Sequence, residues 1–226
     1  MKGITGFSFC ILLLLFTVST ATAQRFRAGF TLAATATDVD GMDTRDHDDD
    51  FNKLGYMIGG IVNTKLDQKN DFQMEINYVK KGTAQFPDSN NMGSYKLALD
   101  YVEIPFILKH HIHINIRKKS VDNFEWEVGA SVGRMVRHTW DLGNYPYPMN
   151  LSNMNMTDVS LLIGFSYNFS SHVALSFRYT NSVIPAIKHD HFQTFQLPYY
   201  FNTGNNLVFQ MGIKFIFGGT AEKKSE

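Results

Sequence analysis

Apolar and polar residues alternate along most of this chain. In the segment 72–79, FQMEINYV, every second residue from Phe72 to Tyr78 is apolar. Successive side chains of a β-strand point to opposite faces, so a period of two predicts strands with one apolar face. Six clear segments of this kind lie near 25–32, 72–79, 124–131, 158–167, 173–180 and 207–217. They predict an all-β protein.

Two further segments alternate less clearly. The segment at about 54–65 is rich in glycine, and the segment at about 95–112 contains Pro105. Proline cannot donate a hydrogen bond to a neighbouring strand, which counts against a strand there. Apolar residues nevertheless continue to alternate with polar ones on both sides of Pro105, from Val102 to Lys109. Both segments are therefore predicted as strands, which gives eight in all.

The intervals between these eight segments alternate in length. Long polar gaps cover 38–53, 87–94, 141–156 and 185–205, whereas Leu66–Asn70 and Ser170–His172 are short and 113–123 is intermediate. Outer-membrane barrels have short turns at the periplasmic end and longer loops outside the cell. The pattern predicts an antiparallel up-and-down transmembrane β-barrel of eight strands, with its long loops outside.

The two faces of the predicted strands differ in size as well as polarity. Bulky apolar side chains would crowd the inside of an eight-stranded barrel, so the apolar face is expected to contact lipid. Aromatic residues near strand ends are expected to form two girdles at the membrane interfaces. These residues are Phe26, Tyr78, Phe124, Trp126, Tyr167, Phe169, Tyr179, Phe215 and Phe217.

The polar face carries charges that are expected in the lumen. They are Glu75, Glu103, Lys109, Glu125, Glu127, Arg178 and Lys214. A charge inside a narrow lumen is tolerated only when it is paired or hydrated, so this mixture of signs predicts a salt-bridge network that plugs the barrel. Arg178 is the expected hub, because a guanidinium can bind two carboxylates at once.

The first residues have the layout of a secretory signal. Lys2 precedes an apolar run from Phe7 to Val18, and small residues follow up to Ala23. The run is too short to span a bilayer as a helix, which needs about 20 apolar residues. We expect export to remove residues 1–23, leaving a barrel domain at 24–217, a short polar tail at 218–226, and a location in the cell outer membrane.

Cysteine and charge counts exclude several classes of function. Cys10, within the predicted signal, is the only cysteine, so the exported part has no disulfide, cysteine-ligated zinc or cysteine nucleophile. The chain carries 21 basic and 21 acidic residues, which gives no reason to expect nucleic acid as a partner.

One strand resembles a known family. The run Leu99–Lys109, LDYVEIPFILK, is similar to the "YLEIPLLLK" strand of PorT-like outer-membrane β-barrel proteins of the Bacteroidetes type. Arg178-Tyr179-Thr180 resembles that family's "RYSYG" strand, although Asn181-Ser182 stands where the family usually has a glycine. The resemblance implies an eight-stranded outer-membrane barrel that tolerates Pro105, and it favours Glu103 as the partner of Arg178. It implies little chemistry, and the secretion and gliding role of the founding member is not carried over.

Candidate ligand sets are incomplete. The Asp-rich loop 38–50 offers oxygen atoms of the kind that calcium prefers, but it lacks the spacing of an EF-hand, and a solvated acidic surface loop is the favoured interpretation. Soft or imidazole ligands occur at His110, His111, His113, His189, His191, Met149, Met154 and Met156, without a full metal-binding pattern.

Catalytic patterns are missing too. No serine, histidine and carboxylate set stands out, and Glu125 and Glu127, two residues apart on a strand, need not flank one substrate. Gly59-Gly60 follows no phosphate-loop spacing. The sequence therefore predicts no catalytic, cofactor or metal site.

The favoured hypothesis is a non-enzymatic outer-membrane barrel, plugged by charged side chains, that binds at the cell surface or belongs to an envelope complex. A small porin-like diffusion channel is the first alternative, and it needs a lumen wide enough for water. An outer-membrane lipid-modifying enzyme and a soluble lipocalin-like ligand binder are weaker ones. Outer-membrane lipid and other envelope proteins are the expected partners, and the sequence indicates no particular ligand.

Overall fold

The computed structural model describes residues 26–40, 51–86, 94–116, 119–141, 154–187 and 204–217, without the side chains of 113–116 and 119–122. Eight strands follow one another along the chain. They are β1 (Phe26–Val39), β2 (Lys53–Lys65), β3 (Asn70–Gln85), β4 (Tyr95–Ile116), β5 (Lys119–Asp141), β6 (Thr157–Asn168), β7 (Val173–Ser182) and β8 (Asn206–Phe217).

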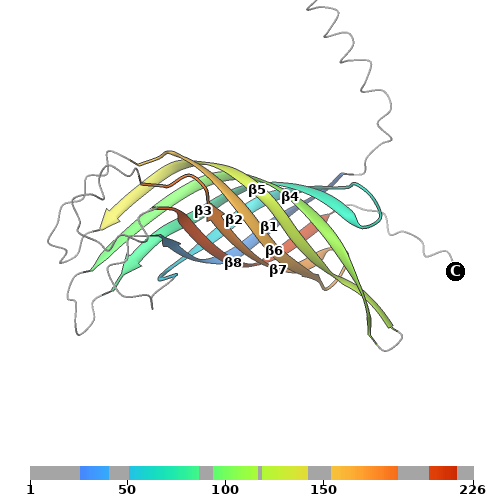
Figure 1. Ribbon diagram of the computed structural model, residues 1–226. Helices are drawn as coiled ribbons and strands as arrows, with labels where there is room; N and C mark the ends of the chain where they lie inside the picture. Colours follow the sequence, from blue (N-terminus) through green and yellow to red (C-terminus); the bar gives the residue numbers. More distant parts are fainter. Residues whose placement is uncertain are drawn as a thin grey trace, which may run out of the picture.

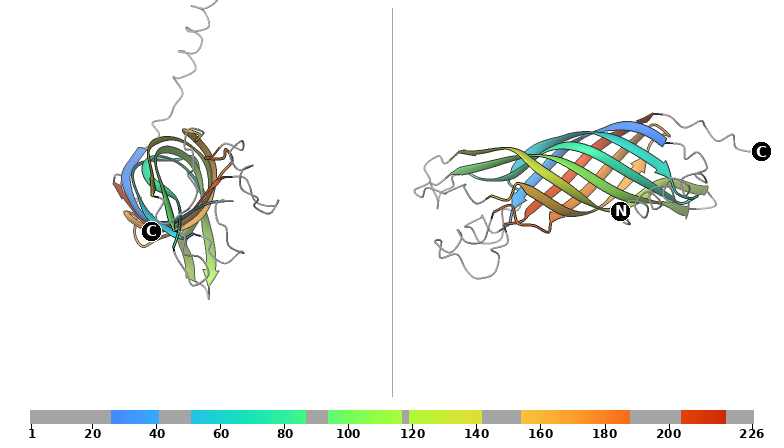
Figure 2. Two further views of the ribbon diagram at one scale, coloured as in Figure 1. Left: turned by 90° about the vertical axis from the view of Figure 1, so that its left-hand side faces the viewer. Right: turned by 90° about the horizontal axis from the view of Figure 1, so that it is seen from above.

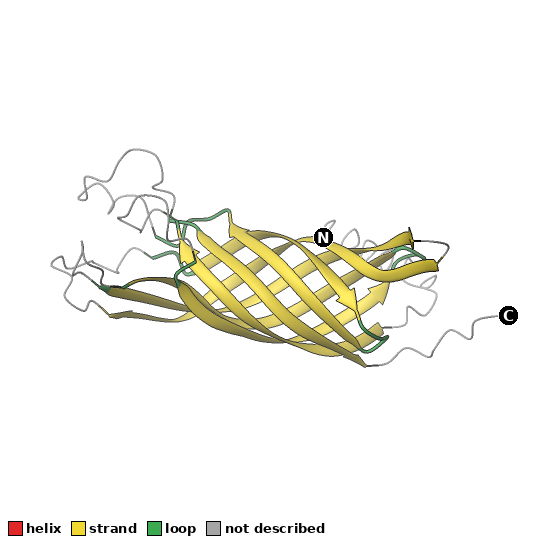
Figure 3. Ribbon diagram, turned by 90° about the horizontal axis from the view of Figure 1, so that it is seen from below, coloured by secondary structure: helices red, strands yellow, loops and turns green. Residues whose placement is uncertain are grey.

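The strands close into one barrel in which neighbours in sequence are neighbours in space. Every pairing is antiparallel, and β8 closes on β1 in a register that runs from Ala28 opposite Phe217 to Val39 opposite Asn206. Figures 1 and 3 show the strands tilted around a common axis. Closure removes the open edges that a flat sheet would leave. The predicted antiparallel up-and-down barrel of eight strands is confirmed.

The period-two pattern separates the inside of this barrel from the outside. Outward-facing apolar residues such as Leu32, Ile58 and Leu161 are between 52% and 60% exposed. Residues on the alternate positions point inward, and among them Thr31, Gln73 and Ser160 are completely buried. The apolar outer face expected from the alternation is present all around the barrel wall.

Aromatic side chains gather on the outer wall at both ends of the barrel. Near the short turns, the Phe124 and Tyr167 rings lie 4.9 Å apart and the Phe30 ring stacks on Phe215 at 4.7 Å. Towards the long loops, Tyr56 lies 6.3 Å from Tyr78. Tyr78, Phe124, Tyr167 and Phe215 belong to the two predicted girdles, and their location at the membrane interfaces stays a prediction.

The prediction that residues 113–123 connect two strands without being part of them is wrong. β4 and β5 continue through most of it and are joined by residues 117–118 alone. With 22 and 23 residues, these two strands are longer than the others, which have 10 to 16. The alternation Ile112, Ile114, Ile116 continues the apolar period of β4, which is the physical reason that the strand does not end at the barrel rim.

Pro105 lies within β4, as the predicted strand required. The register of β3 with β4 pairs Met74 with Phe106 and resumes with Asn77 opposite Glu103. The interruption coincides with Pro105, which has no N–H to donate. On its other side, Pro105 remains in register with Ser131 of β5.

Bulky apolar residues also occur inside the barrel, contrary to the expectation that the interior holds small and polar side chains. They form a buried cluster towards the long loops. Its members are Ala33, Val39, Met57, Val79, Tyr95, Leu97, Leu99, Tyr101, Met135, Ala186 and Ile187, with Trp140 and Met154 packed against it. Small neighbours such as Ala33 leave room for these larger residues, and residues 186–187, between β7 and β8, cover the cluster.

None of the described residues forms a helix long and apolar enough to cross a membrane. The predicted signal peptide at 1–23 and the tail at 218–226 lie outside the described residues. So do residues 41–50, which form most of the Asp-rich loop, and His189 and His191.

Candidate functional site: the charged lumen

All seven charged residues predicted for the lumen are at most 3% exposed. Alternation explains their placement, because each occupies an inward position on β3, β4, β5, β7 or β8. Their ion pairs arrange them in three clusters along the barrel, which we call the central, outer and inner clusters. The inner cluster lies nearest the short turns and the outer cluster nearest the long loops.

Arg178 organises the central cluster. Its Nη2 and Nη1 atoms donate to Glu75 Oε1 at 2.7 Å and Oε2 at 2.9 Å, and its Nε donates to Glu127 Oε2 at 2.7 Å. Asn77 donates to Glu75 Oε2 at 2.8 Å, and Gln73 donates to Glu75 Oε1. A guanidinium suits this position because its donors form a rigid planar fork.

Lys214 completes the central cluster from β8. Its ammonium pairs with Glu127 and lies 3.1 Å from Ser166 Oγ, which itself donates to Glu127 Oε1 at 2.5 Å. Two cations and two carboxylates thus neutralise one another in the middle of the lumen. Such pairing is what makes buried charges tolerable, since each isolated ion would lose several kcal/mol of hydration.

A glycine leaves room for this arrangement. Gly164 of β6 lies in register between Glu127 of β5 and Arg178 of β7. A Cβ at Gly164 would lie 2.5 Å from the Phe177 carbonyl oxygen and 2.8 Å from Arg178 Cγ, which is closer than side chains pack. The missing side chain lets Arg178 cross β6 and reach Glu127.

Lys81 organises the outer cluster. Its ammonium lies 2.5 Å from Glu103 Oε1 and 2.7 Å from Asp158 Oδ2, and 5.2 Å from the centre of the Tyr101 ring. Asn206 donates to Asp158 Oδ2 at 3.1 Å. The buried apolar cluster lies next to the outer cluster, between it and the long loops.

The expected pairing of Arg178 with Glu103 is wrong. Arg178 bonds to Glu75 and Glu127, whereas Glu103 pairs with Lys81. The reason is position along the axis: Glu103 is in register with Asn77 of β3, two residues towards the long loops from Glu75. At that height, the nearest cation is Lys81 on the inward face of β3.

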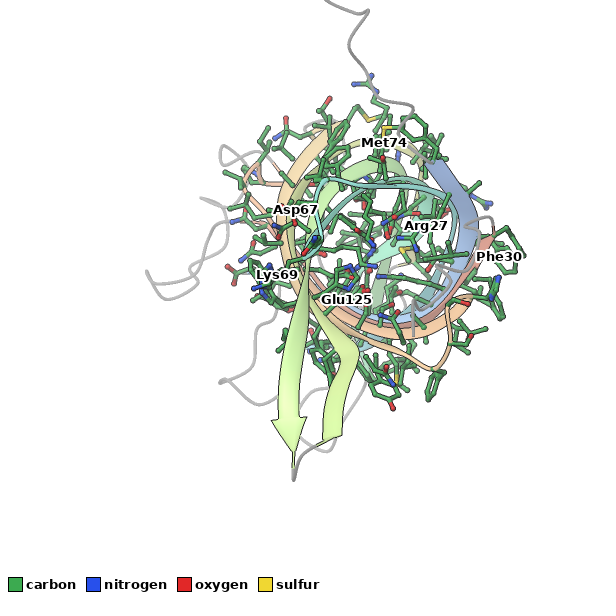
Figure 4. The ribbon with its side chains drawn as sticks, turned by 90° about the vertical axis from the view of Figure 1, so that its right-hand side faces the viewer. Arg27, Phe30, Asp67, Lys69, Met74 and Glu125 are labelled. Atoms are coloured by element: carbon green, nitrogen blue, oxygen red, sulfur yellow. The ribbon has the colours of Figure 1, made fainter. Side chains whose placement is uncertain are left out.

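The inner cluster lies at the short-turn end, which Figure 4 shows, with Arg27 and Glu125 pointing into the barrel and Phe30 and Met74 pointing away. Glu125 pairs with Lys109 and lies 3.1 Å from His111 Nδ1. Asp71 lies 2.7 Å from Arg27 Nη2 and 3.5 Å from His111 Nε2.

Four charged members of these clusters are absent from the seven residues predicted: Arg27, Asp71, Lys81 and Asp158. Arg27 and Asp158 lie on the polar faces of segments whose alternation is clear, so their period signals the lumen. Lys81 and Asp71 lie at or beyond the ends of the segment 72–79, and only the full length of β3 includes them.

The other candidate ligands do not converge. His110 lies 2.8 Å from Asn70 Oδ1, with its ring 5.6 Å from Trp126, while His111 belongs to the inner cluster. Met154 packs against the apolar cluster. Within the described part of the chain, no group of three or more His, Cys, Asp or Glu residues is arranged to hold a metal ion.

The chain is similar to known outer-membrane proteins. The family model described as "Outer membrane protein beta-barrel domain" matches residues 19–188. Neisserial surface protein A is 12% identical over 85% of this chain and 97% of its own, with a TM-score of 0.46. The attachment invasion locus protein Ail of Yersinia pestis is 12% identical over 86% and 99%, with a TM-score of 0.45.

OprG, an outer membrane protein of Pseudomonas aeruginosa, is 12% identical over 87% of this chain and 97% of its own, with a TM-score of 0.36. No curated protein matches the chain. The matching family model covers about three quarters of the sequence, and it locates the protein in the cell outer membrane. The chain belongs to the outer membrane protein beta-barrel domain family.

Proposed function

We propose that this protein is a non-enzymatic outer-membrane barrel with a plugged lumen, which acts through its surface as a binding protein or as a component of an envelope complex. The observation that carries the proposal is the bridge made by Arg178. This residue of β7 binds Glu75 of β3 and Glu127 of β5 across the interior. Such a bridge between distant strands occupies space inside the barrel that a solute would need, which supports a plugged lumen.

The clusters on either side support the same function. Lys81 joins β3 to Glu103 of β4 and Asp158 of β6, so it crosses the lumen on the side towards the long loops. Beyond it, towards the long loops, lie the buried apolar residues Leu97, Leu99 and Tyr101. An ion on this route would meet an apolar layer, where hydration is lost.

A non-enzymatic role is supported by how the buried carboxylates are engaged. Glu75, Glu103, Glu125 and Glu127 each pair with a cation in the interior. A general acid or base needs access to substrate as well as a suitable proton affinity. Carboxylates that are buried below 4% exposure and held in ion pairs suit a structural role better.

A porin-like diffusion channel is the competing function, and conductance separates the two. We expect the purified protein, incorporated into planar lipid bilayers, to give no stable single-channel steps. Incorporation is verified in parallel by recovering folded, protease-resistant protein from vesicles of the same lipid. Reproducible open steps from the wild-type protein would overturn the plugged lumen.

A variant with a wider lumen tests whether the absence of conductance in the wild type is caused by the plugged lumen. Leu99→Ala with Tyr101→Ala removes two fully buried side chains from the apolar layer, and we expect it to raise ion leakage above that of the wild type. Leu161→Ala is the matched control, because Leu161 lies on the outer wall and is 60% exposed. Leakage that rises equally in both variants would point to damaged barrels rather than to an opened lumen.

A finer family assignment is part of the same proposal. The strand from Leu99 to Lys109, which resembles PorT-like proteins of the Bacteroidetes type, forms much of β4 and accommodates Pro105. We propose a PorT-like member that is exported with loss of residues 1–23. Intact-mass measurement of protein from outer membranes tests the export, and recovery of Lys2 in the mature species would contradict it. Proteins that co-purify after mild cross-linking would identify the envelope partner.

A further inference from the structure

The outer wall of β3, β4 and β5 changes from apolar to basic near the long loops. Figure 2 shows β4 and β5 continuing side by side towards this end of the barrel. In one row across the three strands, the register sets Lys80 opposite Asp100 and Asp100 opposite Arg137. In the next outward row, further from the long loops, Val102 lies opposite Arg134. Three cations and one carboxylate therefore occupy a small part of the outer wall.

Alternation places these side chains on the outside of the barrel. Asp100 has the same period on β4 as Ile104, which is 41% exposed on the outer wall. Residues opposite one another in antiparallel strands share a face, so Lys80 and Arg137 face outward with Asp100. Arg134 and Arg137 are exposed, and Lys80 is partly exposed. All three cations can therefore be reached from the surroundings of the barrel.

Two tyrosines indicate the height of these residues in the membrane. The Tyr56 and Tyr78 rings lie 6.3 Å apart on the outer wall, and Lys80 Nζ lies 5.2 Å from the centre of the Tyr56 ring. Tyrosine is enriched where the hydrocarbon core meets the headgroups. A cation over an aromatic ring is held there by the charge distribution of the ring. We therefore expect the three cations at the level of the lipid headgroups.

The carboxylate among the cations is covered. Asp100 is 4% exposed, and Tyr78 Oη donates to its Oδ2 at 2.7 Å. Arg134 donates from Nη1 to Thr157 Oγ1 at 3.2 Å, which uses one of its five donors. In the part of the chain that the structure describes, none of the three cations forms an ion pair. They keep donors for an anion, with a net of two positive charges around the covered carboxylate.

The wall on the side away from the long loops is apolar. The next outward positions of the three strands are Ile76, Ile104 and Val132, which are 58%, 41% and 50% exposed. Ile104 lies directly opposite Val132. An anionic lipid would place its headgroup on the cations and its acyl chains on these residues. A free anion would contact only the cations.

We propose that Lys80, Arg134 and Arg137 form a binding site for a phosphate group of a lipid in the leaflet at the long-loop end, with the acyl chains on the apolar wall beside it. Guanidinium groups bind phosphate through paired N–H donors, and lysine binds it as a point charge. With the long loops outside the cell, this leaflet is the outer one, which in an outer membrane contains phosphorylated glycolipid. The identity of the lipid rests on that orientation.

The test measures how tightly lipid A, the phosphorylated glycolipid used as the probe, stays bound to the folded protein. Native mass spectrometry of the protein released from detergent micelles counts the bound lipid molecules. Lipid A without its phosphates and inorganic phosphate are the comparison ligands. Phosphatidylglycerol supplies an anionic phospholipid for comparison.

Two variants remove the same amount of charge from different places. The site variant combines Lys80→Gln, Arg134→Gln and Arg137→Gln. The control variant removes three exposed lysines outside the site and combines Lys65→Gln, Lys69→Gln and Lys96→Gln. Lys96 is on the same outer face but lies opposite Asp141, so a carboxylate already accompanies its charge. Folding of both variants is checked by the change in gel mobility on boiling.

We expect each charge lost from the site to weaken binding of lipid A roughly fivefold, so that the site variant binds on the order of a hundredfold more weakly than the wild type. The control variant should bind as the wild type does. Removing the phosphates from lipid A should weaken its binding to the wild type but not to the site variant. Inorganic phosphate at millimolar concentration should not displace the lipid, because it makes no contact with the apolar wall.

Four outcomes would overturn the proposal. Equal losses in the two variants would mean general attraction between charges and no site. Unchanged binding of lipid A without its phosphates would remove phosphate as the ligand group. Displacement by inorganic phosphate would indicate a site for a free anion, and equally tight binding of phosphatidylglycerol would remove the glycolipid as the source.

The single changes keep the test decisive if the site variant does not fold. Lys80→Gln, Arg134→Gln and Arg137→Gln should each weaken binding of lipid A roughly fivefold, and single changes without effect would contradict the site. None of these results bears on the plugged lumen, which conductance tests separately.

Discussion

Arg178 and Glu127 form a direct ion pair although their strands are not neighbours, because the backbone of Gly164 lies between them. Arg178 Nε donates to Glu127 Oε2 at 2.7 Å, and the register places Gly164 opposite both residues. The guanidinium reaches over β6 into the middle of the lumen, where it also binds Glu75. The position without a side chain therefore leaves the room that Arg178 uses to reach the central cluster.

Gly164→Ala should destabilise the barrel by about 1–3 kcal/mol, the usual cost of forcing an extra group into a packed interior. The new Cβ would lie 2.8 Å from Arg178 Cγ and closer still to the Phe177 carbonyl oxygen. Urea unfolding in lipid vesicles, followed by the fluorescence of the two tryptophans, measures the change. Gly60→Ala is the control, since its Cβ would meet only Ile76 Cγ2 at an ordinary 3.7 Å. Equal losses in the two variants would contradict the role assigned to Gly164.

The central ion pairs should appear as strong coupling between Arg178 and Glu75. Removing one partner of a buried pair costs about 3–5 kcal/mol, because the other charge remains buried alone. Arg178→Met should therefore lower the free energy of unfolding by an amount of this order. Adding Glu75→Gln should restore part of the loss, with a coupling of about 0.5–3 kcal/mol in the double-mutant cycle.

A second cycle provides the control for this coupling. Glu103 binds Lys81 in the outer cluster, so Arg178→Met and Glu103→Gln should be additive to within about 0.5 kcal/mol. If Arg178 couples more strongly to Glu103 than to Glu75, the division of the lumen into separate clusters is wrong.

The fold could be predicted because its main determinant is local in sequence. A period of two sorts side chains to two faces without reference to any distant contact, and the clear segments around Phe72 and Leu161 needed nothing more. Strand ends were harder to predict. The alternation of Ile112 and Ile114 looks the same whether the strand lies in the barrel wall or continues beyond it. The two cases differ only in whether β3 and β6 pair with the hairpin of β4 and β5, which the alternation does not show.

The pairing of the lumen charges could be predicted only in part. Sequence alternation places Arg178 and Glu103 inside, but it does not give their heights along the axis. Those heights follow from the register between strands, which depends on turn lengths and on the register shift between Ile112 and Ile114 of β4. Arg178 pairs with Glu75 and not with Glu103 because of the strand register of the closed barrel.

The hydrogen bonds to Asp67 should stabilise the turn between β2 and β3 down to a lower pH than an aspartate with an ordinary pKa would. The Asn70 side chain and the Lys69 backbone N–H donate to Asp67 at 2.7 Å each, and these bonds lower the pKa of its carboxyl below 3.8. A carboxylate with a lowered pKa in the folded state stabilises that state above its unfolded pKa and loses the effect as pH falls through the folded value. The stability difference between wild type and Asp67→Ala should therefore be constant well above pH 3.8, decrease as pH falls below 3.8, and disappear once pH is below the folded pKa.

Carboxyl carbon shifts of Asp67, followed by NMR against pH, measure the same effect directly. Asn70→Ala removes the largest cause and should move the midpoint of the titration upwards, towards that of a free aspartate. A midpoint that stays unchanged in this variant would contradict the part assigned to the Asn70 amide.

The orientation of the barrel gives the last prediction. Outer-membrane barrels keep their short turns in the periplasm and their long loops outside the cell. The turn at Leu66–Asn70 is short, because Leu66 and Asp67 N–H groups both donate to the Asn70 carbonyl, whereas Asp43 belongs to the long connection between β1 and β2. An impermeant thiol reagent applied to intact cells should therefore label Asp43→Cys and leave Gln68→Cys unlabelled until the outer membrane is opened. Residues 24–226 contain no cysteine, so a signal from that part of the chain comes from the introduced residue. Labelling of Gln68→Cys alone on intact cells would mean that the barrel has the opposite orientation.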